Sequence, residues 1–148
     1  MRAIVQRVRS AAVDVAGECV GRIGPGMLVY LGVAGDDSET DADFLADKVR
    51  HLRIFPDAAG KMNLDVAEAG GAVLVVSNFT LLADCRAGRR PAFDAAARPE
   101  LADRLYQHFC AALRRSIAVE TGQFRAMMQV SAVNDGPINV LLDSKRAF

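Results

Sequence analysis

Two short polar segments carry the residue types in this 148-residue chain that could act on a ligand. Residues 77–81 read Ser-Asn-Phe-Thr-Leu and follow an apolar run, and residues 134–139 read Asn-Asp-Gly-Pro-Ile-Asn. Both adjoin runs typical of β-strands, and a loop mounted on a strand end can present backbone N–H groups and hydroxyls to a ligand. These segments are therefore the first candidates for a functional site.

The first segment places amide donors beside hydroxyl groups. Residues 73–76 are all β-branched or aliphatic, which predicts a strand buried on both faces. Ser77, Asn78 and Thr80 could simply cap the end of that strand. Alternatively, they could form, with Phe79, a cluster of donors for a carbonyl oxygen that gains negative charge. The residue types allow both interpretations.

A conventional Ser/Thr–His–Asp triad is not expected, because Thr80 has no base near it in the sequence. His51 and His108 both fall in helical patterns, and neither is within twenty residues of Thr80. The cysteines are Cys19, Cys85 and Cys110. They cannot all pair and none stands in a CxxC, so we expect a reduced cytoplasmic protein with no metal and no other cofactor.

The second segment joins glycine, which allows the widest range of backbone conformations, to proline, which allows the narrowest. Gly136 allows a backbone approach that a side chain would block. The bond from Gly136 to Pro137 can be cis at small cost. A Gly-Pro pair is also common in ordinary turns, so this pair alone does not identify a site.

Composition indicates one globular domain over residues 1–148, with a short tail from about residue 144. Hydrophobic residues make up 51% of the chain, yet no apolar run approaches the ~20 residues of a membrane span, so no membrane association is expected. The formal net charge is zero, which is unusual for an RNA-binding protein. Basic residues are nevertheless clustered locally at Arg86, Arg89 and Arg90.

Periodicity predicts an α+β fold with a curved, mixed or antiparallel, barrel-like sheet and two main helices. A capping box formed by Ser38 and Asp41 predicts the start of the first helix, and Pro99 that of the second. Strand-like runs are expected at residues 4–8, 13–15, 19–23, 27–33, 53–55, 72–76, 128–133 and 140–142.

The two segments resemble the signature motifs of the D-aminoacyl-tRNA deacylases of the bacterial and eukaryotic type. Those motifs usually read Ser-Gln-Phe-Thr-Leu and Asn-X-Gly-Pro-Val-Thr. The resemblance covers essentially the whole chain and includes residues 1–8, 23–26, 52–55, 61–64, 88–91 and 128–131. It implies an ester hydrolase that releases D-amino acids from tRNA, a chiral proofreading step in translation. Activity on glycyl-tRNA mischarged on tRNA-Ala is also implied.

The resemblance implies a role for each motif in an intertwined homodimer. The Phe79 and Thr80 amides would hold the ester carbonyl, the Thr80 hydroxyl would orient substrate or water, and Ser77 and Asn78 would complete the catalytic set. A Gly136–cis-Pro137 element would reach into the other subunit's site and exclude L-aminoacyl groups by a clash.

Further residues are assigned by the same resemblance. Arg7, Met62 and Met128 would lie near the substrate, although Arg7 could be a surface charge and Met62 core packing. The cluster Arg86, Arg89 and Arg90 would contact the 3′ acceptor end of tRNA, or would simply keep a loop soluble.

Two residues depart from the family motifs. Asn78 replaces the usual Gln and Asn139 the usual Thr, which could change the hydrogen bonds of the site and loosen selectivity towards L or glycyl substrates. Two other functions therefore stay open, a non-catalytic dimeric domain that binds RNA or protein, and an esterase for small D-amino-acid esters.

Overall fold

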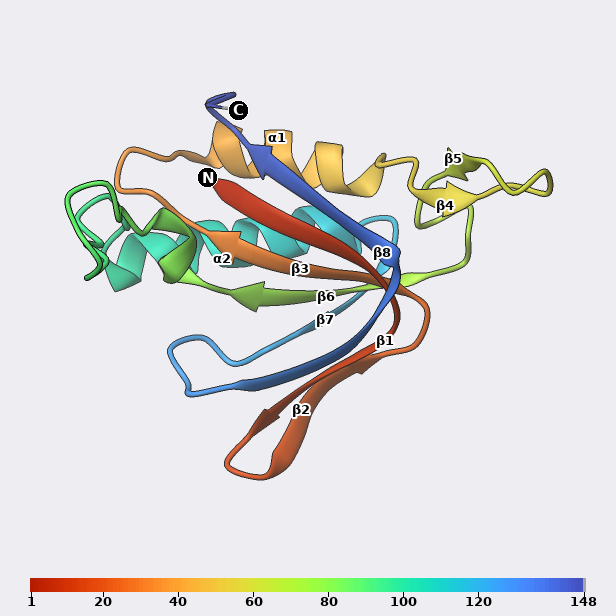
Figure 1. The fold of residues 1–148 in the computed structure, drawn as a ribbon, viewed down its shortest axis with the longest axis horizontal. Coiled ribbons are helices and arrows are strands. Elements are labelled where there is room, and N and C mark those ends of the chain that lie inside the picture. Colours follow the sequence, from red (N-terminus) through yellow and green to blue (C-terminus); the bar gives the residue numbers. More distant parts are fainter. Residues whose placement is uncertain (148) are drawn as a thin grey trace.

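The computed structural model describes residues 1–147, in which a curled six-stranded sheet carries both helices on one side (Figure 1). The long strand β1 (Arg2–Val15) pairs first with β3 (Gly26–Gly32), then with β2 (Glu18–Ile23), and along its length with β8 (Gln129–Asp143). The strands β6 (Ala72–Ser77) and β7 (Ala118–Thr121) extend the sheet in parallel from β3. The sheet is thus mixed.

The sheet is nearly closed into a barrel. Its order is β2-β1-β3-β6-β7, with β8 also on β1, and its ends approach each other where Gly21 of β2 packs against the backbone of Thr121 in β7. A side chain at Gly21 would collide with that backbone, so glycine is required there. The predicted α+β class and barrel-like sheet are confirmed.

Both helices begin where their sequence signals predict. In α1 (Glu39–Arg50) the backbone N–H of Ser38 donates to the Asp41 carboxylate over 2.9 Å, which completes the capping box. The helix α2 (Pro99–Arg114) has Pro99 in its first turn, where the missing N–H costs no hydrogen bond. No helix in residues 1–147 is both long and apolar enough to cross a membrane.

The sheet is buried on both faces by two clusters of apolar side chains. Alternate residues of β3, such as Met27 and Val29, join the cluster beneath the helices, whereas Leu28 joins a second cluster with Val76 inside the curl. The hydroxyl of Tyr106 on α2 donates to the carbonyl oxygen of Val75 over 2.9 Å and fixes α2 against β6. The predicted burial of residues 73–76 on both faces is confirmed.

Several strand boundaries differ from the sequence predictions. Residues 4–8 and 13–15 belong to one continuous strand, since irregular pairing with β8 lets β1 bend without ending. Residues 134–139 likewise lie within β8 rather than in a loop between two strands. The connection at 118–121 is the strand β7, and the run at 53–55 gives only the two-residue β4 (Phe55–Pro56), paired with β5 (Met62–Leu64).

The predicted tail is anchored where the structure describes it. The amine of Lys145 lies 3.2 Å from the Asp41 carboxylate, and the backbone N–H of Ser144 donates to the carbonyl of Met1. Residues 144–147 therefore follow the surface of α1, and the last residue of the predicted tail, Phe148, lies outside the described residues.

Candidate active site

The first motif forms a one-turn 3₁₀ helix, η1 (Phe79–Leu82), immediately after β6. The backbone N–H of Asn78 donates to the carbonyl of Leu31 over 2.8 Å, which fixes the end of β6 to β3. The side-chain oxygen of Asn78 then accepts two hydrogen bonds, one from the Thr80 N–H at 3.1 Å and one from the Thr80 hydroxyl at 2.5 Å. Asn78 is thus the N-cap of this short helix.

This cap determines what Thr80 and Phe79 can do chemically. The Thr80 hydroxyl donates to a neutral amide oxygen, which cannot take up its proton, so nothing in this contact activates it as a nucleophile. The Thr80 N–H is shared with the cap. The Phe79 N–H occupies the first position of η1, where no intrahelical acceptor exists. The Phe79 amide is therefore the donor best placed for a ligand oxygen.

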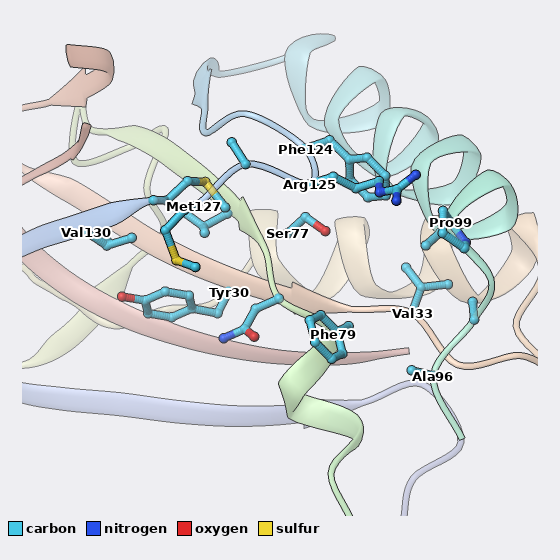
Figure 2. Close-up of a pocket in the computed structure, with 16 residues that line it drawn as sticks. Tyr30, Val33, Ser77, Phe79, Ala96, Pro99, Phe124, Arg125, Met127 and Val130 are labelled. Carbon is cyan, nitrogen blue, oxygen red and sulfur yellow. The ribbon is translucent and has the colours of Figure 1, made fainter. Parts of the chain in front are cut away.

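A pocket of about 630 Å³ opens beside this turn (Figure 2). Ser77, Asn78 and Phe79 border it where β6 ends, with Tyr30 and Met127 at one end. Its other lining residues are Val33, Val76, Ala96, Ala97, Pro99, Ala102, Phe124, Arg125, Ala126, Met128 and Val130. The lining is mostly apolar with a few polar groups, which is the usual character of a small-molecule site.

Tyr30 and Phe79 are two of the aromatic residues of this lining. A phenol is protonated at neutral pH and burial raises the pKa of Tyr30 further, so its hydroxyl can donate a hydrogen bond to a ligand. The Phe79 ring is 57% exposed and packs edge-on against Phe93, with 5.1 Å between ring centroids. The Phe79–Phe93 contact joins the turn to the arginine-bearing loop that follows it.

That loop is closed at its base by a backbone bridge between Asp84 and Ala92, with hydrogen bonds of 2.8 and 2.9 Å. Arg86 forms a forked ion pair with Asp84, at 2.6 Å between Nη2 and Oδ2, and this pair lowers the pKa of the Asp84 carboxyl. Arg89 and Arg90 are exposed, and neither has an ion pair within residues 1–147. The charge available to a phosphate is thus greatest at Arg89 and Arg90.

The second motif is held by side chains of its own strand and of β1. Asn134 donates from its amide to the carbonyls of Arg7 and Ile138, over 2.9 and 3.2 Å. The Arg7 guanidinium lies 3.1 Å from the Asp135 carboxylate and also donates to the carbonyl of Ile54 over 2.7 Å. Arg7 therefore holds the second motif in place through its contacts with Asp135 and Asn134.

The Gly136–Pro137 peptide is cis, and Gly136 has φ +127°, a conformation that residues with a Cβ rarely adopt. Gly136 and Pro137 are both exposed. Asn139, the second departure from the family motif, pairs with Gln6 of β1. Gly136 and Pro137, which we call the Gly-Pro tip, are thus exposed on the surface of the chain.

One chain does not bring the two motifs into one pocket. Of the residues expected near the substrate, Ser77, Asn78, Phe79 and Met128 line the cavity. Thr80, Arg7, Met62, Gly136, Pro137 and the cluster Arg86, Arg89 and Arg90 do not line it. Met62 lies on β5 with 61% of its side chain exposed, so a simple core role is wrong.

The sequence carries no recognisable signal for the rest of the pocket wall, which includes Tyr30 and residues 124–127. Tyr30 lies in a strand that reads as buried core, and residues 124–127 lie in a connection without a recognisable motif. Only the fold brings them beside Ser77. No cluster of three His, Cys, Asp or Glu side chains suited to a metal occurs in residues 1–147.

Comparison with known proteins decides the family. The model of the family described as D-Tyr-tRNA(Tyr) deacylase matches residues 4–143. A D-aminoacyl-tRNA deacylase of Anaeromyxobacter dehalogenans is 62% identical over 149 residues, which cover 100% of both chains. The chain belongs to the D-Tyr-tRNA(Tyr) deacylase family. As a deacylase of this family it is a hydrolase that acts on the ester bond of D-aminoacyl-tRNA.

Another curated relative and two solved structures are also similar to this chain. The D-aminoacyl-tRNA deacylase of Syntrophobacter fumaroxidans is 56% identical over 100% of both chains. The solved structure of a c-Myc DNA Unwinding Element Binding Protein superimposes with a TM-score of 0.91 at 36% identity, covering 97% of this chain and 98% of that one. A probable eukaryotic D-amino acid tRNA deacylase shares the deacylase fold, with a TM-score of 0.83 at 16% identity over 95% of this chain and 97% of that one.

Proposed function

We propose that the 3′ acceptor end of a D-aminoacyl-tRNA enters the pocket beside η1, where water cleaves the ester to free D-amino acid and tRNA. The observation that carries this proposal is the combination of a free Phe79 N–H with a mostly apolar cavity of about 630 Å³. Such a cavity can hold a terminal nucleoside with its aminoacyl group. The reaction would take place in the cytoplasm, where aminoacyl-tRNA is used.

The site needs to supply little chemical activation, because an aminoacyl-tRNA ester is already reactive. The Phe79 N–H would donate to the carbonyl oxygen as it gains charge during attack by water. The Thr80 hydroxyl, held by Asn78, would orient substrate or water, and the terminal 2′-hydroxyl of the tRNA would assist. The water oxygen bonds to the acyl carbon, the bond from that carbon to the ribose oxygen breaks, and the ribose oxygen takes up the proton that the water loses.

Chiral selection would require a second copy of the chain. The Gly136–Pro137 tip is exposed and does not line the pocket of its own chain, so a partner subunit could insert it near the ester. Backbone atoms at that position would leave no room for an L side chain, whereas a glycyl group would pass. Glycyl-tRNA, including glycine mischarged on tRNA-Ala, would therefore also be a substrate.

The strand β8 offers an edge for such a homodimer. Within the described residues β8 pairs only with β1, and Val133 and Leu141 on it are 54% and 59% exposed. Long exposed strand edges with apolar side chains are usually covered by another chain. We therefore place the partner subunit against β8.

The acceptor stem would contact the loop that follows η1. Arg89 and Arg90 are its unpaired cations within residues 1–147, whereas Arg86 is already partly neutralised by Asp84. The Phe79–Phe93 contact keeps this loop next to the pocket. Few phosphate contacts would form, so binding to tRNA should be weak, and added salt should weaken the part that comes from Arg89 and Arg90.

A second candidate is nucleic-acid binding without hydrolysis. The specific observation in its favour is that Asn78 occupies both the amide and the hydroxyl of Thr80, which leaves the site with fewer free donors. The 36%-identical protein of known structure is named for binding to a DNA unwinding element. Retention of Gly136, Pro137 and Thr80 favours the deacylase.

The proposal is tested by comparing turnover of D-tyrosyl-tRNA with that of D-tyrosine ethyl ester. Rapid loss of the tRNA ester with little loss of the ethyl ester is expected, because the nucleoside fills most of the pocket. Equal turnover per molecule would indicate a small-molecule esterase. Binding of tRNA without turnover of either ester would indicate the nucleic-acid-binding domain.

A further inference from the structure

The candidate pocket contains one charged side chain, Arg125. It is the only charged residue among those that line the cavity in the part of the chain that the structure describes. It lies beside Phe124 on the side that faces Pro99, opposite the end formed by Tyr30 and Met127 (Figure 2). Arg125 is exposed, and its guanidinium has no ion pair or hydrogen bond with any residue in the range 1–147. It is free to bind a ligand.

The backbone at Arg125 adds a second observation. Its φ is +61°, in the left-handed region that residues with a Cβ adopt at a cost relative to glycine. The Arg125 side chain does not stabilise the fold through an ion pair or hydrogen bond with any of the described residues. This φ belongs to a turn in which the backbone N–H of Ala126 donates to the carbonyl of Gln123 over 3.2 Å, and the turn presents the Arg125 side chain at the rim of the pocket. The unpaired guanidinium is therefore available to a ligand.

We propose that Arg125 binds the phosphate on the 5′ side of the terminal nucleoside. This inference rests on the proposed function, which places the ester carbonyl at the Phe79 N–H. The base and ribose would then lie along the apolar lining, and the 5′-phosphate would leave the cavity on the Arg125 side. A guanidinium fits two phosphate oxygens with two parallel hydrogen bonds. Arg125 would thus align the RNA end with the turn.

The contact can be measured with two probes that cannot be hydrolysed. They are 3′-(D-tyrosylamino)-3′-deoxyadenosine with and without a 5′-phosphate. In the wild-type protein the phosphate should tighten binding about tenfold, and in Arg125→Met by less than about twofold. The matched control Arg115→Met removes an exposed arginine at the other end of α2 and should keep the full gain. A wild-type protein without the gain, or an Arg125→Met variant that keeps it, would overturn the inference.

Arg125→Gly separates a binding role from a structural one. Glycine suits φ +61°, so the thermal unfolding midpoint should stay the same or rise while the phosphate gain is lost. A lower midpoint with equal weakening of both probes would show a structural role and contradict the proposal.

Failure of the Arg125 contact can be told apart from failure of the proposed function, because the phosphate gain and the hydrolysis of D-tyrosyl-tRNA are measured separately. Hydrolysis of D-tyrosyl-tRNA by wild-type protein without a phosphate gain would overturn the Arg125 contact alone. A phosphate gain that depends on Arg125, without hydrolysis, would refute ester cleavage in the pocket beside η1 and support the nucleotide contact.

Discussion

At the scale of single residues, Asn78 controls what Thr80 can do. Its side-chain oxygen accepts from both the amide and the hydroxyl of Thr80, and an amide oxygen is not a base. The hydroxyl can therefore orient a substrate or a water molecule, but it has no group here that would make it a nucleophile. The free donor of the turn is the Phe79 N–H.

Replacement of Thr80 by valine tests this assignment. Thr80→Val keeps the shape and the backbone amide but removes the hydroxyl, so kcat for D-tyrosyl-tRNA should fall by only about 10- to 100-fold. Thr80→Ser, which keeps the hydroxyl, should stay near wild type. A loss of about 10⁵-fold or more in Thr80→Val would instead indicate a nucleophile.

The residues of the site were only partly predictable from the sequence. Ser77, Asn78 and Phe79 stand in a recognisable motif at the end of a strand, so they could be found. The two hydrogen bonds that Asn78 accepts from Thr80 could not be predicted, because they depend on the length of the Asn78 side chain and on the backbone geometry of the turn. Tyr30 and Arg125 carry no motif and join the site only through the pairing of β3 with β6 and the course of the chain before β8.

At the scale of elements, β8 and β1 together hold the Gly-Pro tip. The Arg7 guanidinium is only 12% exposed and lies 3.1 Å from Asp135, while Asn134 donates to the Arg7 carbonyl. Arg9 also approaches Asp135, at 3.3 Å. These contacts explain how a tip that is exposed on its own chain can still be held in one position.

Loss of the Arg7–Asp135 pair should weaken chiral selection more than catalysis. Asp135→Asn removes the carboxylate charge and leaves Arg7 partly buried without its partner, which should lower the free energy of unfolding by about 1–3 kcal/mol. The ratio of D- to L-tyrosyl-tRNA hydrolysis should fall, with D turnover little changed. The matched variant Asp57→Asn alters a half-buried loop carboxylate distant in sequence; the amide oxygen of asparagine can still accept from the Ala59 and Lys61 N–H groups, so the ratio should be kept. An unchanged ratio in Asp135→Asn would show that this pair does not position the tip.

The packing of α2 predicts a stability change at alkaline pH. Burial raises the pKa of the Cys110 thiol to about 11. Above its ordinary value of 9.0 the unfolded chain loses this proton while the folded chain keeps it, so stability falls as pH rises towards 11. Cys110 alone should contribute up to about 1.4 kcal/mol per pH unit to the slope measured in denaturant titrations. Cys110→Val should show a shallower slope, and an equal slope would exclude Cys110 as a source.

Element positions were predicted best where local chemistry is decisive. The capping box at Ser38 and the proline at residue 99 act within one helical turn, and both helix starts were correct. The continuity of β1 and β8 depends on irregular pairing between strands distant in the sequence, so local pattern divided each of them in two. The strand β7 forms because β6 is available beside it, which residues 118–121 do not reveal.

At the scale of the whole molecule, the proposed mechanism requires two copies of the chain. Gly136 and Pro137 do not line the pocket of their own chain, and β8 offers an unpaired edge within the described residues. A single copy would hold donors without the element that excludes L substrates. Chiral selection is therefore expected to depend on dimer formation more strongly than hydrolysis does.

Sedimentation equilibrium should give about twice the chain mass of 15.8 kDa at micromolar concentration. Leu141→Lys places a charge on the exposed side of β8 and should shift the protein towards monomer, because a buried unpaired ammonium is costly. The control Val20→Lys changes a 39%-exposed residue on β2 and should remain dimeric. A wild-type monomer, or dimeric Leu141→Lys, would contradict the placement of the interface on β8.

Hydrolysis of matched D- and L-tyrosyl-tRNA, with glycyl-tRNA alongside, tests most directly whether the protein is a D-selective ester hydrolase with a steric gate. We predict rapid loss of the D ester, measurable loss of the glycyl ester and survival of the L ester. Equal loss of D and L esters would contradict the gate formed by Gly136 and Pro137. Survival of all three esters would contradict the assignment of the pocket beside η1 as the active site.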